Sequence, residues 1–190
     1  RCTAVGPSVM GDGVVTGADN TAIGNKSQLN VTSGASNTSV GSLSMGIGVT
    51  TGNNNVALGY QAGKAMTSAA DSVFVGSSAG LAVTSGTRNT AIGFAALATE
   101  NANGDNTAVG YAALNTLDAN AQGNNVAIGT NSGKLMTTGI NNALLGHNSG
   151  AVITTGTKNT LIGAQAGDAL TIGINNTAVG YDALSTSVDG

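Results

Sequence analysis

The chain has 190 residues, which is enough for one domain or two small ones. Six basic residues against nine acidic residues give a net charge of −3, which excludes an electrostatic nucleic-acid binder and a polybasic membrane-surface protein. Aromatic residues make up 3% of the chain and charged residues 8%, and there are 30 glycines. Glycine and asparagine are poor helix formers, so this composition also argues against a helical bundle.

The first residues give few clues to function. Cys2 is the only cysteine in the sequence, so we expect neither an intrachain disulfide nor a multi-cysteine metal site, and Cys2 is either a free thiol or pairs with another chain. The sequence has no run of 18 apolar residues, so no membrane insertion is expected. Because the chain starts at Arg1 without a signal-peptide pattern, we expect a processed chain or part of a longer one.

A five-residue motif that ends in glycine recurs along the chain. It reads NTAIG at 20–24, NTSVG at 37–41, NVALG at 55–59, SVFVG at 72–76, NTAIG at 89–93, NTAVG at 106–110, NVAIG at 125–129, NALLG at 142–146, NTLIG at 159–163 and NTAVG at 176–180. Successive closing glycines are 17, 18, 17, 17, 17, 19, 17, 17 and 17 residues apart. This spacing predicts a repeat domain over residues 16–190, preceded by an irregular segment over residues 1–15.

Residues aligned on the closing glycine form columns, which we number from that glycine. Position −1 is always a large aliphatic residue and position −3 is mostly Thr or Val. Side chains alternate along a strand, so positions −1 and −3 share one face, and we expect that face to be the core. Ile92→Asp or Ile128→Asp would then be strongly destabilising, whereas Lys134→Ala or Lys158→Ala would not.

Further columns follow the glycine. Position +3 is always Ser or Ala, and position +7 is mostly large and apolar, with Gly48 and Glu100 as interruptions. A unit of 17 residues is too short to fold alone, so the units are expected to stack as about ten coils of an all-β parallel β-solenoid, at about 4.8 Å per coil. The longer spacings that end at Gly59 and Gly129 are expected to form bulged turns without shifting the core columns.

Position −4 is Asn in nine of the ten units, with Ser72 as the exception. This column could be a polar ligand track, but Asn at a turn favours a stacked amide ladder. Glycosylation sequons occur at Asn25, Asn30, Asn37 and Asn175, and their use depends on the source.

Residues that carry chemistry are sparse. His147 is the only histidine and the acidic residues are scattered, without the spacing of a calcium loop or a phosphate loop. The sequence therefore predicts no enzyme activity and no catalytic, metal or cofactor site. Position +1 holds aromatic residues or His in five units, at Tyr60, Phe94, Tyr111, His147 and Tyr181. These side chains either cover coil junctions or form a shallow patch for sugar contacts.

The NTAIG and NTAVG-Y-x-A-L units resemble the repeat regions of phage tail fibres and related surface fibres. They are also similar to the head repeats of trimeric autotransporter adhesins, which read roughly NSVAIG-xx-S in a shorter unit. The resemblance spans about residues 16–184. It implies a β-roll that forms a homotrimer in an extracellular or virion setting. The self-cleaving chaperone domain that often ends tail fibres is not visible in this sequence.

Three functions remain open at this point. The first is a structural segment of a fibre or spike, which could bind a receptor or a surface glycan. The second is a subunit of a filament in which solenoid ends stack. The third is an ice-binding β-solenoid, which needs an exposed threonine array; the alternation of Thr with Val at position −3 argues for burial instead.

The units carry apolar residues on both strand faces, more than one thin coil should bury. We therefore expect positions −2 and +4 to be buried between chains, most clearly at Leu97, Leu114, Leu144 and Leu161. Parallel homotrimerisation would cover this strip, with end-to-end stacking as an addition.

Overall fold

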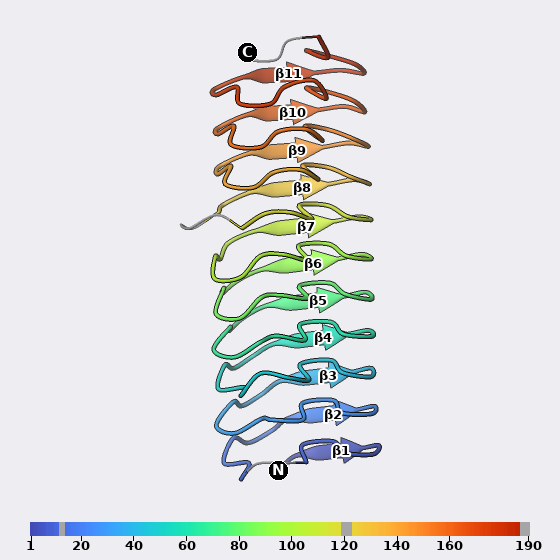
Figure 1. Ribbon diagram of the computed structural model, residues 1–190, viewed down its shortest axis with the longest axis vertical. Coiled ribbons are helices and arrows are strands. Elements are labelled where there is room, and N and C mark those ends of the chain that lie inside the picture. Colours follow the sequence, from blue (N-terminus) through green and yellow to red (C-terminus); the bar gives the residue numbers. More distant parts are fainter. Residues whose placement is uncertain (12–13, 119–122, 187–190) are drawn as a thin grey trace.

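The computed structural model describes residues 1–11, 14–118 and 123–186 and is a parallel β-solenoid (Figure 1). Its strands form one parallel sheet in chain order: β1 (Thr3–Val5), β2 (Thr21–Ile23), β3 (Thr38–Val40), β4 (Val56–Leu58), β5 (Val73–Val75), β6 (Thr90–Ile92), β7 (Thr107–Val109), β8 (Val126–Ile128), β9 (Ala143–Leu145), β10 (Thr160–Ile162) and β11 (Thr177–Val179). The described residues contain no helix. The predicted all-β solenoid is therefore confirmed.

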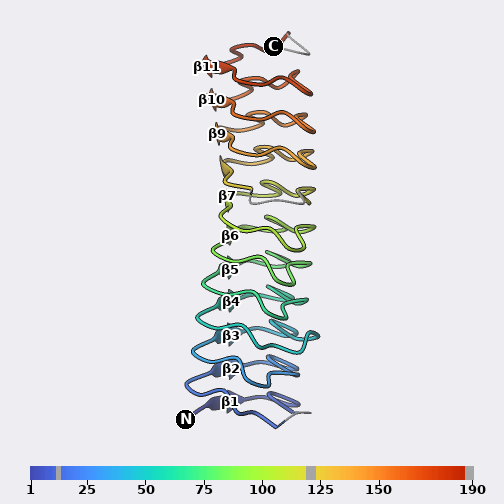
Figure 2. The same ribbon diagram turned by 90° about the vertical axis from the view of Figure 1, so that its left-hand side faces the viewer.

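Each strand pairs in register with the strand of the next coil. The strands lie along one edge of the rod, and the remainder of every coil extends away from them (Figure 2). The closing glycine that follows each strand has a φ between 126° and 142°, a region that residues with a Cβ rarely adopt. A Cβ on Gly110 would also lie 2.5 Å from the carbonyl oxygen of Gly129 in the next coil. Glycine therefore both makes this turn and allows the coils to stack closely.

The first residues belong to the same stack. Residues 1–15 were expected to be irregular, but β1 lies within them and pairs with β2 from Thr3↔Thr21 to Val5↔Ile23. The unit that ends at Gly6 lacks the Asn that marks nine of the ten other units, because Cys2 stands at position −4. This substitution hid the additional coil from the sequence pattern.

The longer spacings leave the strand register unshifted. Between Gly41 and Gly59 the pairing continues from Thr38↔Val56 to Val40↔Leu58, and between Gly110 and Gly129 it continues from Thr107↔Val126. The extra length therefore lies in the connections, as predicted. In the second connection, residues 119–122 lie outside the described residues.

The assignment of the core face was wrong. Position −2 points inward and is buried in every coil from β2 to β11, whereas position −1 faces outward. Leu144 is 1% exposed and the adjacent Leu145 is 46% exposed. The interior of the coil is thin, so the position occupied mostly by Ala is the one that fits inside, and the larger branched residues remain outside. Ile92 and Ile128 are accordingly exposed rather than core residues.

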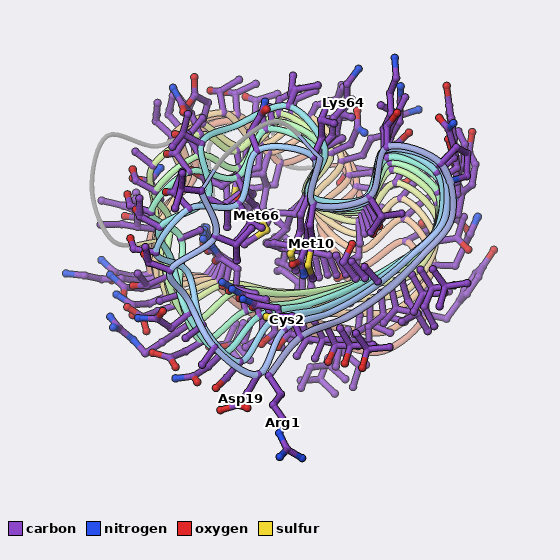
Figure 3. All side chains as sticks on the ribbon, turned by 90° about the horizontal axis from the view of Figure 1, so that it is seen from below. Arg1, Cys2, Met10, Asp19, Lys64 and Met66 are labelled. Carbon is purple, nitrogen blue, oxygen red and sulfur yellow. The ribbon has the colours of Figure 1, made fainter. Side chains whose placement is uncertain are left out.

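Positions −2 and +4 were expected between chains, but a single chain already buries them. Leu97, Leu114 and Leu161 are each 0% exposed. Together with the +3 and +7 columns, these side chains form one continuous core. Figure 3, which looks along the rod, shows Met10 and Met66 inside the coil at positions +4 and +7. The physical reason is that positions −2 and +4 fill the same space in turn.

This alternation can be followed coil by coil. Where position −2 is large, as at Phe74, position +4 is glycine, and a Cβ on Gly80 would lie 2.5 Å from the Phe74 ring. Where position −2 is Ala91, position +4 is Leu97. Two coils have small residues at both positions, and these coils carry buried methionines at position +7, Met66 and Met136. Neighbouring coils also contribute, since a Cβ on Gly133 would lie 2.8 Å from Leu114 and from Leu144, in the coils on either side.

Candidate functional site

The Asn column forms a buried hydrogen-bonded ladder. In each step the side-chain oxygen of one Asn accepts a hydrogen bond from the backbone N–H of the residue at position −4 in the next coil, as between Asn20 and Asn37 at 2.9 Å. The side-chain Nδ2 of Asn20 donates to the carbonyl oxygen of Gly34 at 2.7 Å. Ser72 continues the ladder by accepting from the N–H of Asn89. The predicted amide ladder is therefore confirmed, and burial makes these side chains unsuitable as a ligand track.

The outward side chains of the strands form a continuous surface, which we call the sheet face and define as positions −3 and −1 of β1–β11. These outward residues are Thr, Ala and Val at position −3 and Val, Ile and Leu at position −1, with no charged side chain among them. Ile23, Leu58 and Ile162 are each more than a third exposed. At one strand spacing per coil, the sheet face is about 50 Å long.

The aromatic residues of position +1 lie beside the sheet face. Tyr60, Phe94 and Tyr111 are each about half exposed. The rings of Phe94 and Tyr111, in adjacent coils, are stacked with their centroids 5.5 Å apart and an angle of 12° between the planes. This geometry fits the interpretation that they cover a coil junction. His147 is exposed in the same column.

A hollow of about 290 Å³ lies beside position +5 of three coils. It is lined by side chains of three successive coils, which include Asn131, Lys134, Asn148, Ala151 and Asp168. Figure 3 shows the direction of position +5 through Lys64, which occupies the same position as Lys134. The side chain of Lys64 points outward, on the side of the coil opposite Cys2 and the start of β1. The pattern of the columns did not reveal this hollow, because it depends on which short and long side chains happen to follow one another.

Glu100 is a buried carboxyl in the apolar column at position +7. Its Oε1 accepts a hydrogen bond from the backbone N–H of Asn103 at 2.8 Å, and its Oε2 has no partner among the described residues. Burial raises the pKa of Glu100 above its ordinary value, and the negative charge of Asp118 adds to this effect. On the surface, Arg88 donates two hydrogen bonds to Asp105, which lowers the pKa of that carboxyl.

The modification candidates have different surroundings. Asn37 is part of the buried ladder, so its side chain is inaccessible to a glycosylating enzyme in the folded chain. Asn25 and Asn175 are exposed, and Asn30 is partly exposed. Cys2 is exposed, and its sulfur lies 4.0 Å from the Nδ2 of Asn20, at the end of the ladder.

Within the described ranges, no group of three or more His, Cys, Asp or Glu side chains is placed to hold a metal ion. The part of the chain that the structure describes also contains no helix long and apolar enough to cross a membrane. The fold and its repeats define the chain as a β-solenoid repeat protein. No family model, curated protein or solved structure matches the chain.

Proposed function

We propose that this chain is a structural segment of an extracellular or virion surface fibre, and that it assembles as a parallel homotrimer through the sheet face. The observation that carries the proposal is the exposure of the sheet face, an uncharged strip through eleven coils with Val, Ile or Leu at position −1 and mostly Thr or Val at position −3. Contiguous apolar surface of this kind marks an interaction site in soluble proteins.

A second copy of the same chain fits this strip well. The strip repeats at every coil, so parallel copies in register present the same aliphatic rows to one another along their full length. The coil interior is already filled by residues of the same chain, so assembly needs no exchange of core residues. A rod held in this way suits a spacer that projects from a surface.

The assembly can be tested by measuring the mass of the chain in solution by light scattering at several concentrations. We expect a trimer for the unaltered chain and a monomer for the double variant Ile92→Asp/Ile128→Asp, because both side chains lie on the sheet face. Ile172→Asp is the matched control, since Ile172 is 54% exposed but outside the strands. This control should leave the mass unchanged.

Two results would contradict the proposal. One is a monomeric mass for the unaltered chain at micromolar concentration. The other is a trimer that Ile92→Asp/Ile128→Asp leaves intact. Masses that grow without limit as concentration rises would favour the filament subunit instead.

Ice binding is a second candidate, because the expected burial of position −3, which argued against it, was wrong. Position −3 faces outward rather than inward, and seven of the eleven strands begin with an outward Thr. The resulting Thr-x-aliphatic rows lie on a regular sheet with one row per coil. A measurement of thermal hysteresis tests this function. It uses the same face as the trimer, so a stable trimer without thermal hysteresis would exclude it.

A further inference from the structure

The hollow at position +5 has a simple structural cause. Ala151 lies between Lys134 and Asp168, which occupy the same position in the coils on either side. Its side chain is short, whereas the same position holds Leu81 in another coil. The backbone around the space is held in place, because Leu135 N–H donates to the Ala151 carbonyl oxygen at 3.0 Å. The hollow is therefore preformed.

The polar groups around the hollow are incompletely paired. Nδ2 of Asn131 donates to Oδ1 of Asn148 at 3.2 Å, while Oδ1 of Asn131 is buried without a partner. Neither Lys134 nor Asp168 forms an ion pair within the described residues. Two coils separate these two charges, which places their backbones roughly 10 Å apart. A cation, an anion and two amides thus surround the same hollow.

The apolar part of the lining completes the description. Leu135 is 44% exposed and borders the hollow beside Ala151. A hollow that combines apolar surface with a few convergent polar groups is typical of small-molecule sites, and about 290 Å³ lies at the lower end of their volumes. The space suits one ring with its substituents rather than an extended chain.

We propose that this hollow binds a carboxylated pyranose, such as one unit of an acidic surface polysaccharide. The ammonium group of Lys134 pairs with the sugar carboxylate, and the carboxylate of Asp168 accepts hydrogen bonds from hydroxyl groups at the other side of the ring. The amides of Asn131 and Asn148 contact the polar edge, and Leu135 packs against the C–H face.

Other ligand chemistries fit less well. A free phosphate ion could pair with Lys134 but would leave Asp168 without a donor and Leu135 without an apolar contact. A neutral sugar would leave the Lys134 cation without a counter-charge. The proposed site rests on the proposed function only in that a surface fibre meets such polysaccharides. The hollow faces away from the sheet face, so trimer assembly leaves the hollow open.

The test uses the full chain and three probes: trigalacturonate and sialyllactose as acidic saccharides, and lactose as the neutral one. Saturation-transfer NMR and calorimetry report binding. We expect at least one acidic saccharide to bind about tenfold more tightly than lactose, since a hydrogen bond to a charged group has an energy of this order. The two acidic probes distinguish uronic acids from sialic acids as the source of the carboxylate.

Three variants test whether the saccharide binds at this hollow. Lys134→Ala should weaken it about tenfold, whereas Lys64→Ala, the same change at the same repeat position outside the hollow, should have no effect. Ala151→Leu should abolish binding by filling the hollow, and the presence of Leu81 in another coil shows that the fold accepts leucine there. Circular dichroism establishes that each variant is folded.

The proposal is overturned if neither acidic saccharide binds, if lactose binds equally well, or if Lys134→Ala and Ala151→Leu leave binding unchanged. The solution mass of the same samples separates the two proposals. A trimer that binds no saccharide contradicts the site alone, and a monomer that binds contradicts the assembly alone.

Discussion

Positions −2 and +4 of one coil share the same interior space, and this leads to a quantitative prediction. Phe74 is 0% exposed, so Phe74→Ala should lower the free energy of unfolding by about 3–5 kcal/mol. Gly80→Leu alone should lower it by about 1–3 kcal/mol, because the new Cβ would lie 2.5 Å from the Phe74 ring. The double variant places Ala at −2 and Leu at +4, the pair that the next coil has in Ala91 and Leu97.

The double variant should therefore be more stable than Phe74→Ala alone. Leucine at position 80 needs a positive φ, which Leu97 already adopts at 51°, so we expect the double variant within about 2 kcal/mol of the unaltered chain. The coupling energy between the two substitutions should therefore be at least about 2 kcal/mol, the difference between the summed single costs and the cost of the double variant. Urea unfolding of the four proteins, followed by circular dichroism, measures it. If the two costs simply add, positions −2 and +4 do not fill a common space and the description of the core is wrong.

Three further predictions concern the turn, the buried carboxyl and the strand faces. Backbone strain alone should cost about 1–3 kcal/mol, and Gly110→Ala should lower the free energy of unfolding by more than this. Gly180→Ala should cost only the strain, because the nearest contact of its Cβ would lie at 3.9 Å. Equal costs of the two variants in thermal unfolding would contradict close coil stacking. The pKa of Glu100 is raised in the folded chain. The free energy of unfolding should therefore fall, as the pH rises from the ordinary glutamate pKa to the raised one, by about 1.4 kcal/mol per pH unit. Urea unfolding over a pH series should show this slope in the unaltered chain and not in Glu100→Gln. Leu144→Ala should cost about 2–5 kcal/mol of stability, and Leu145→Ala should instead reduce the assembled mass; a reversed outcome would restore the original assignment of the core face.

The repeat length was enough to predict the solenoid, because 17 residues cannot bury a core without neighbours. The predicted inward face of the strand was wrong, because the most hydrophobic position, −1, is not a buried one. The columns contained a better guide. The Asn at position −4 and the small residue at position −2 share one side of the strand, as Asn106 and Ala108 do, and both are buried. A thin interior accepts an alanine and a hydrogen-bonded amide more readily than isoleucine.

The candidate sites were less predictable than the fold. The aromatic column could be located from spacing, but the hollow beside Ala151 depends on a single short residue between two long ones. In the sequence, Glu100 is visible only as an interruption of an apolar column. Its hydrogen bond to the Asn103 backbone could not be deduced from spacing. Each of these features breaks the repeat, and the average pattern describes only what the coils share.

The pairing of positions −2 and +4 within one coil also has a consequence for how such a chain can change over generations. Because a large residue at −2 and its partner glycine at +4 lie within the same 17-residue unit, as Leu161 and Gly167 do, a duplication or deletion of one whole unit carries both along. The recombined rod keeps this pair matched within every unit, and what changes at the new junction are the contacts between neighbouring coils, such as that of Gly150 with Leu161. Length is therefore a property that this architecture can gain or lose in steps of about one strand spacing.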